Sequence, residues 1–139
     1  SINSQVLRRI LIIDDEPYNI LAMQMILNQM KIKGLSKVVD RAYNGMEAFT
    51  KVKDAYNKGS HIYGLIFTDI SMPLMDGFEL AEEIRNFYRQ HKVPQPMIVA
   101  CTGHVEEAYI QKAWTHEIDE VIPKPVKPEV LREILYVLL

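Results

Sequence analysis

Apolar residues along the chain alternate between short unbroken runs and longer segments in which they recur every three or four positions. The unbroken runs, clearest at residues 10–13 and 97–101, have the length of strands that are buried on both faces. The segments between them have the spacing of amphipathic helices. Each run precedes such a segment, so the pattern predicts five strand–helix units.

The boundaries of these units follow from turn and helix-start residues. We expect strands at residues 10–13, 38–42, 62–69, 97–101 and, more weakly, 118–122, with the short second strand at an edge. Helices should begin at Pro17, Gly45, Gly77, just after Gly103, and at Pro128. This order predicts one doubly wound α/β domain, a parallel sheet with helices on both faces and right-handed crossovers.

Composition narrows the class of protein. The 139 residues are 48% hydrophobic, and a net charge of −2 spread along the chain favours neither a nucleic-acid surface nor a membrane surface. No apolar stretch approaches the roughly 20 residues that a membrane span needs. The single Cys101 excludes an internal disulfide and predicts a reducing, cytoplasmic location. We interpret residues 1–139 as one domain of a longer protein, and attachment of that protein to a membrane stays open.

Polar side chains follow four of the predicted strands. Asp14 and Asp15 come after the first strand, Asp69 ends the third, Thr102 follows the fourth and Lys124 the fifth. Parallel strands present these ends at one edge, where carboxylates would repel one another unless a cation joined them. Mg²⁺ prefers such oxygen ligands, and an Asp beside a Lys and a hydroxyl suits formation of an aspartyl phosphate.

Several nearby residues have plainer interpretations. Asp76 is expected to be a turn or helix-cap residue, and Met72 and Met75 to be packing residues. Cys101 is expected to be a small buried hydrophobe, with a redox role the lesser alternative. His104 is expected to face the phosphorylation pocket, and a functional role for it there and no role are weighed equally.

Four motifs together resemble the response-regulator receiver domains of two-component and phosphorelay signalling. They are Ile-Ile-Asp-Asp-Glu-Pro at residues 12–17, Asp-Ile-Ser-Met-Pro-Leu-Met-Asp-Gly at residues 69–77, Thr102 after an apolar strand, and Lys124-Pro125. Asn19 and residues 44–48 are most similar to receivers of hybrid histidine kinases. The resemblance implies a flavodoxin-like (βα)5 fold with strand order 2-1-3-4-5.

The resemblance also implies a magnesium site. In receivers the residue at the place of Asp15 ligates Mg²⁺ directly, and that of Asp14 mostly through water. Asp69 and the main-chain carbonyl of Ser71 complete the implied ligand set.

It further implies that Asp69 takes a phosphoryl group from a phosphohistidine on a histidine kinase or histidine phosphotransfer protein. Lys124 would pair with Asp69 and then with the phosphoryl oxygens, and Thr102 would move towards them. The domain would thus catalyse its own phosphorylation and dephosphorylation. The Lys124-Pro125 bond is expected to be cis, and a weak homodimer is a further expectation.

Three departures from the family pattern concern the conformational change that phosphorylation causes in receivers. Val121 stands where receivers carry an aromatic, Pro123 precedes Lys124, and Gly103 with His104 follows Thr102. We therefore expect phosphorylation to shift residues 103–109 while Val121 keeps its rotamer. We also expect His104 and Ser71 to set the lifetime of the phosphoryl group.

Other functions remain open at this stage. A pseudo-receiver would keep the fold as a binding module, but the complete set of site residues argues against it. A phosphatase with an Asp nucleophile usually has a second acid two residues later, where Ser71 stands here. A flavodoxin-like cofactor binder lacks support because no Gly-rich loop follows the first strand. The sequence leaves open the partner, the stimulus, the output domain, and whether a hybrid kinase or a stand-alone regulator carries this domain.

Overall fold

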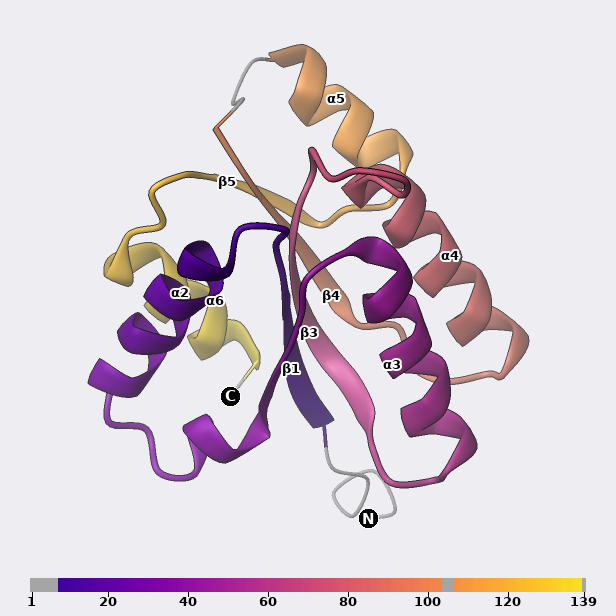
Figure 1. The fold of residues 1–139 in the computed structure, drawn as a ribbon, viewed down its shortest axis with the longest axis horizontal. Coiled ribbons are helices and arrows are strands. Elements are labelled where there is room, and N and C mark those ends of the chain that lie inside the picture. Colours follow the sequence, from indigo (N-terminus) through magenta and orange to yellow (C-terminus); the bar gives the residue numbers. More distant parts are fainter. Residues whose placement is uncertain (1–7, 104–106, 139) are drawn as a thin grey trace.

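Five parallel strands form a single sheet in the computed structural model, which describes residues 8–103 and 107–138 (Figure 1). They are β1 (Arg8–Ile13), β2 (Val39–Ala42), β3 (Ile62–Asp69), β4 (Met97–Thr102) and β5 (Glu120–Pro123). Their order, β2-β1-β3-β4-β5, is the predicted one. The short β2 lies at an edge, as predicted.

Helices cover both faces of this sheet. The described helices are α2 (Pro17–Gln29), α3 (Gly45–Asn57), α4 (Gly77–Gln90), α5 (Glu107–Thr115) and α6 (Pro128–Leu138). Residues of α2 and α6 pack on one face, and residues of α3, α4 and α5 pack on the other. This arrangement confirms the doubly wound α/β prediction.

Side chains of β1 show how one strand supplies both cores. Leu11 and Ile13 point towards α3 and α4, whereas Ile10 and Ile12 point towards α2 and α6. All four side chains are buried. Because both faces are covered, the run must be apolar at every position, and this is the pattern seen in the sequence.

Strand boundaries differ from the prediction by one or two residues at four strands: β1 begins at Arg8, β4 ends at Thr102, and β2 and β5 both begin later than expected. Val38 ends a short 3₁₀ helix, η1 (Leu35–Val38), which the sequence analysis did not predict. β5 begins at Glu120, because Asp119 donates its backbone N–H to the Ile98 carbonyl and its side chain turns to Arg85. On α5, the Trp114 side chain is 65% exposed, whereas Ala113 beside it is buried in the core.

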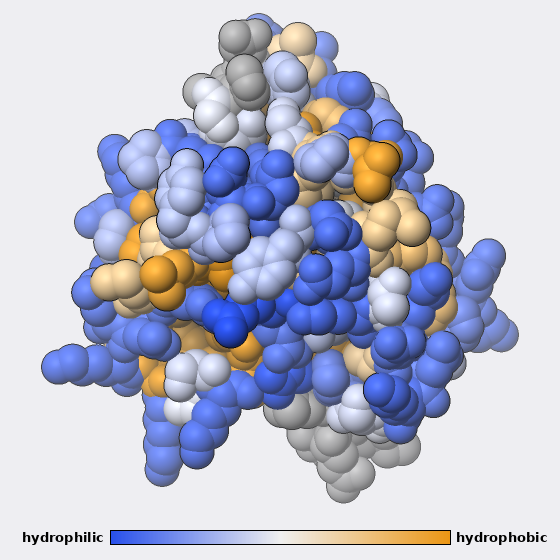
Figure 2. All heavy atoms as spheres, in the orientation of Figure 1, coloured by the Kyte–Doolittle hydropathy of each residue, from blue (hydrophilic) through white to orange (hydrophobic). Residues whose placement is uncertain are grey.

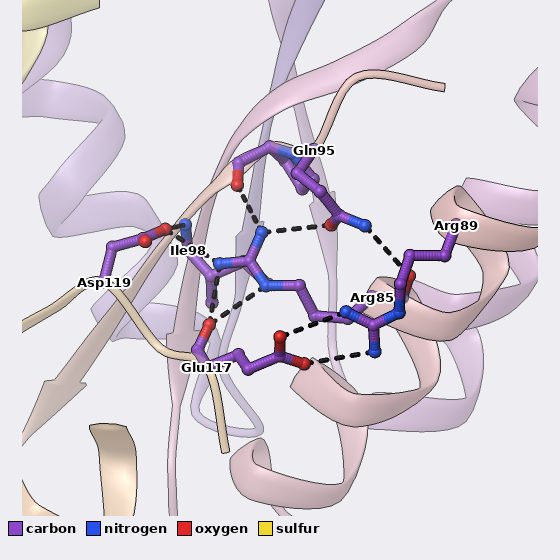
Figure 3. A network of polar contacts seen from close by, with 7 residues as sticks. Arg85, Arg89, Gln95, Ile98, Glu117 and Asp119 are labelled. Atoms are coloured by element: carbon purple, nitrogen blue, oxygen red, sulfur yellow. Dashed lines mark hydrogen bonds and ion pairs between the residues drawn. The ribbon is translucent and has the colours of Figure 1, made fainter. Parts of the chain in front are cut away.

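A buried arginine holds the edge of the sheet that lies away from the strands' carboxyl ends (Figure 3). The Arg85 side chain, 6% exposed, reaches from α4 to the segments before β4 and β5. Its guanidinium donates to the carbonyls of Pro96 and Glu117, at 2.6 and 2.7 Å, and to the Asp119 carboxylate at 2.8 Å. Asp119 also accepts the Ile98 backbone N–H at 2.8 Å, so one charge pair fixes three segments.

A second arginine on the same helix makes a weaker contact. Arg89 pairs with the Glu117 carboxylate at 3.0 Å, but both side chains are about half exposed. Water screens such a pair and competes for its hydrogen bonds, so its net contribution to stability is small. The two arginines therefore provide a matched comparison.

We predict that Arg85→Ala lowers the free energy of unfolding by about 3 kcal/mol or more, since buried carbonyls and the Asp119 carboxylate lose their partner. Arg89→Ala should cost less than about 1 kcal/mol. Urea unfolding followed by circular dichroism measures both values. Equal losses for the two variants would contradict the assigned role of Arg85.

Candidate functional site

The predicted site residues meet at the carboxyl ends of the strands. Asp14 and Asp15 follow β1, Asp69 ends β3, and Lys124 follows β5. One oxygen from each of the three aspartates lies within 4.8 Å of the others. The sheet order accounts for this convergence, because β1 and β3 are direct neighbours.

Lys124 joins two of the three carboxylates. Its Nζ lies 2.8 Å from Asp14 Oδ2 and 3.2 Å from Asp69 Oδ1. Burial by itself lowers the pKa of Lys124, but the hydrogen bond to Asp14 and the charges of Asp69 and Asp14 together raise it above its usual value. The ammonium is therefore retained at neutral pH and offsets part of the negative charge.

Asp69 is held at the end of β3 by local contacts. The backbone N–H of Ile70 donates to Asp69 Oδ1 at 2.9 Å, which orients the carboxylate. Lys124 contacts the same oxygen, and within residues 8–103 and 107–138 no partner holds Asp69 Oδ2. Burial raises the pKa of Asp69, Lys124 lowers it and Asp14 raises it, and the net shift is upward. The carboxylate is thus less stable as an anion here than in water.

Asp14 and Asp15 have different surroundings although they are adjacent in sequence. Asp14 is 5% exposed, accepts the Glu16 backbone N–H at 2.9 Å and pairs with Lys124. Asp15 is half-buried and, in the part of the chain that the structure describes, its carboxylate has no protein partner. An all-oxygen donor set with one uncommitted carboxylate fits a hard divalent cation such as Mg²⁺.

The turn after β3 depends on Gly77. A Cβ at this position would lie 2.4 Å from the carbonyl oxygen of Asp69 and 2.9 Å from Cα of Ile70. Only glycine lets α4 begin directly against the end of β3, where its N–H donates to the Ile70 carbonyl at 2.8 Å. The sequence marked Gly77 as a helix start, but its close approach to Asp69 was missed, because only the three-dimensional packing reveals it.

The remaining candidates take the following places. Ser71 lies exposed in the loop after β3, Thr102 is buried at the end of β4, and Asp76 caps α4 by accepting the Glu79 N–H at 2.9 Å, as expected. The Lys124-Pro125 bond is cis, as predicted.

Cys101 is buried, and burial raises the pKa of its thiol to about 12, which fits an inert small hydrophobe.

Of the residues expected to take part in the conformational change, the structure describes Val121 and Gly103. Val121 is half-buried against the core shared by α3, α4 and α5. A Cβ at Gly103 would meet no atom of the described residues within 4 Å, so their packing does not require glycine there. His104 and Val105 lie outside the described residues, and the expectations about them stay predictions.

We predict that Asp69→Asn raises the melting temperature of the metal-free protein near neutral pH. Because its pKa is raised by folding, Asp69 favours the folded state when protonated, and that stability is lost as the pH rises through its folded-state pKa. The asparagine cannot ionise, so the variant should gain a few degrees at pH 7 and lose this gain in acid below the usual Asp pKa.

Thermal unfolding in a chelating buffer from pH 3 to pH 8 measures this difference, at roughly one-unit steps across the usual Asp range. Glu83→Gln, which neutralises an exposed carboxylate on α4, is the control and should change little. A lower melting temperature for Asp69→Asn than for the wild type at pH 7 would show that folding does not disfavour the ionised form of Asp69.

Comparison with known proteins gives a consistent result. A family model described as the response regulator receiver domain matches residues 10–136. The "Hybrid signal transduction histidine kinase L" of Dictyostelium discoideum is 31% identical over 132 residues, which cover 95% of this chain and 7% of that kinase. The chain therefore spans a small part of this relative.

Solved structures add two close likenesses. The receiver domain of the Arabidopsis thaliana histidine kinase CKI1, complexed with Mg²⁺ and BeF3⁻, is 26% identical with a TM-score of 0.76, covering 93% of this chain and 90% of that one. The receiver domain of Saccharomyces cerevisiae Ssk1, in complex with the histidine phosphotransfer protein Ypd1, is 27% identical with a TM-score of 0.72. The likeness covers 90% of this chain and 83% of that one.

Proposed function

Because the chain belongs to the response regulator receiver family, we propose that Asp69 is the residue that accepts the phosphoryl group in this phosphorelay receiver domain. One observation carries the proposal. Asp69, Asp14 and Asp15 offer oxygens within 4.8 Å of one another, and Lys124 Nζ contacts two of these carboxylates. A pseudo-receiver would not need this set of charges, so that alternative has no support in the site.

The proposed reaction transfers a phosphoryl group from a histidine nitrogen of the partner to a carboxylate oxygen of Asp69. The free carboxylate oxygen of Asp69 attacks the phosphorus of a phosphohistidine, the P–N bond breaks, and the imidazole nitrogen leaves with the electron pair. The Lys124 ammonium, which contacts Asp69 before the reaction, then pairs with the oxygens of the incoming phosphoryl group. The protein contributes position and charge, as is usual in phosphoryl transfer.

Receiver domains bind Mg²⁺ at an acidic pocket, and the residues of this chain fit that ion. We propose Asp15, Asp69 and the Ser71 main-chain carbonyl as direct ligands, with Asp14 acting through water. The uncommitted carboxylate of Asp15 and the engagement of Asp14 with Lys124 and Glu16 support this division. When bound, the cation would neutralise the charge that builds up around the phosphoryl group.

A histidine kinase or histidine phosphotransfer protein is the proposed partner. Tyr18, Leu21 and Met25 follow one another along α2 and are 66%, 56% and 53% exposed. α2 starts directly after the Asp14–Asp15 pair, and apolar surface gathers over this helix on the left of Figure 2. We assign this strip to a histidine phosphotransfer domain, because such a domain must bring its histidine to Asp69, and because the Ssk1 receiver binds one.

The wider setting is also proposed. The buried, unpaired Cys101 supports a cytoplasmic location. The match to only 7% of the Dictyostelium kinase supports a place within a larger protein. Among the described residues no helix is long and apolar enough to cross a membrane. The weak homodimer and the shift of residues 103–109 around a fixed Val121 stay predictions.

We predict that acetyl phosphate with Mg²⁺ adds one phosphoryl group to the wild-type chain and none to Asp69→Asn, since the asparagine amide is not a nucleophile. Intact mass measures the incorporation, and chelator should abolish it in the wild type. Asp76→Asn keeps a good helix cap in the same loop and should still be labelled. Full labelling of Asp69→Asn would refute the assignment of the acceptor.

For Mg²⁺ affinity, we predict a larger loss from Asp15→Asn than from Asp14→Asn. Removing a direct ligand should cost more than removing a water-mediated contact, which is itself worth about 10–100-fold. Isothermal titration calorimetry measures both affinities, with Glu16→Gln as the neighbouring control. If Asp14→Asn proves the more damaging change, the proposed ligand roles must be exchanged.

A further inference from the structure

A small cavity lies directly behind the Asp14–Lys124 ion pair. Its volume is about 100 Å³, and it is lined by residues of α2, of β1, β3 and β4, and of the segment 124–126. Most of its lining is apolar. The apolar lining residues are Ile12, Ile13, Ala22, Met23, Ile26, Phe67, Cys101, Pro125 and Val126.

Three polar groups complete the lining. Asp14 and Lys124 form one side, and Asn19 on α2 contributes the third. Within the described part of the chain, the Asn19 side-chain amide pairs with no protein group, although it is half-buried. An apolar pocket with a few convergent polar groups is the usual composition of a small-molecule site.

The shape of the cavity limits what it could hold. An engineered apolar cavity of about 150 Å³ binds benzene, so this smaller cavity, which is open on one side, suits a ligand of roughly one six-membered ring. Ala22 is exposed at the mouth of the cavity, and its small side chain leaves the entrance open. Charged molecules are disfavoured because the floor cannot hydrate them.

We propose that this cavity is a regulatory site for a small uncharged aromatic molecule with one hydrogen-bonding group. The ring lies on the apolar floor, and the polar group bonds to Asn19. The regulatory half of this inference rests on the proposed function of Asp69. An occupant excludes water from one side of the Asp14–Lys124 pair, and the lower local dielectric strengthens that pair. Lys124 is then shared less readily with a phosphoryl group, so occupancy slows phosphorylation.

The binding half is tested without any phosphorylation. The probe is 4-fluorophenol, followed by fluorine NMR on the full chain, and saturable binding in roughly the millimolar range is expected for so small a ligand. Ala22→Leu should close the mouth and weaken binding at least tenfold. Gln29→Leu adds the same side chain at an exposed position of α2 that does not line the cavity, and it should bind as the wild type does.

The role of Asn19 has its own control. Wild type should prefer 4-fluorophenol to fluorobenzene, and Asn19→Ala should lose that preference while still binding fluorobenzene. Absence of saturable binding by the wild type, or equal binding by Ala22→Leu, would overturn the site.

The regulatory half is tested with acetyl phosphate and Mg²⁺. Saturating 4-fluorophenol should slow phosphorylation of the wild type at least threefold and leave Ala22→Leu unaffected. If 4-fluorophenol binds without changing the rate of phosphorylation, the regulatory role is refuted but the binding site is confirmed. Failure of the wild type to be labelled at all would refute the function proposed for Asp69, while the NMR result would still decide whether the cavity binds.

Discussion

Three carboxylates and one ammonium share the carboxyl edge of the sheet, and their mutual repulsion and attraction govern the whole site. Lys124 lies 110 positions after Asp14 in the sequence, so only the complete sheet brings the two together. The ammonium offsets part of the negative charge, and Asp69 still has a raised pKa. The folded protein thus holds a strained anion, which a divalent cation and then a phosphoryl group can relieve.

The rest of the fold keeps this arrangement rigid. Gly77 allows α4 to start against the Asp69 carbonyl, and the Ile70 N–H orients the Asp69 carboxylate from the same turn. At the far edge of the sheet, Arg85 binds α4 to the segments before β4 and β5 (Figure 3). At the far edge, the Arg85 guanidinium is paired with a carboxylate. At the site edge, three carboxylates share one ammonium, so negative charge is left over. Side chains with shifted pKa values, such as Asp69 here, are typical of functional sites.

The residues of the sequence predicted a doubly wound parallel sheet, the edge position of β2 and the convergence of Asp14, Asp15, Asp69 and Lys124. They could do so because strands buried on both faces must be continuously apolar, and because parallel strands end at one edge. The strand order came from the family resemblance of the motifs and not from the apolar pattern. The start of β5 was misplaced because Ile118, a buried core residue, looks like part of a strand, whereas Asp119 is turned towards Arg85.

Other features could not be read from the sequence. The unequal surroundings of Asp14 and Asp15 depend on where the Lys124 side chain falls, which no pattern encodes. The steric need for Gly77 and the cavity beside Asn19 likewise arise from distances between elements. Where a property depends on packing between distant segments, local periodicity carries no information about it.

The central claim is that the crowded carboxylates, the cation and the phosphoryl group form one coupled unit. Calorimetric titration of Mg²⁺ with and without beryllofluoride, a mimic of the phosphoryl group, measures that coupling directly. Because coupling between two ligands is reciprocal, beryllofluoride should tighten Mg²⁺ binding by about tenfold or more, and Mg²⁺ should tighten beryllofluoride binding by the same factor. An unchanged Mg²⁺ affinity would contradict the account, since it would mean that the two ligands do not share the charge around Asp69.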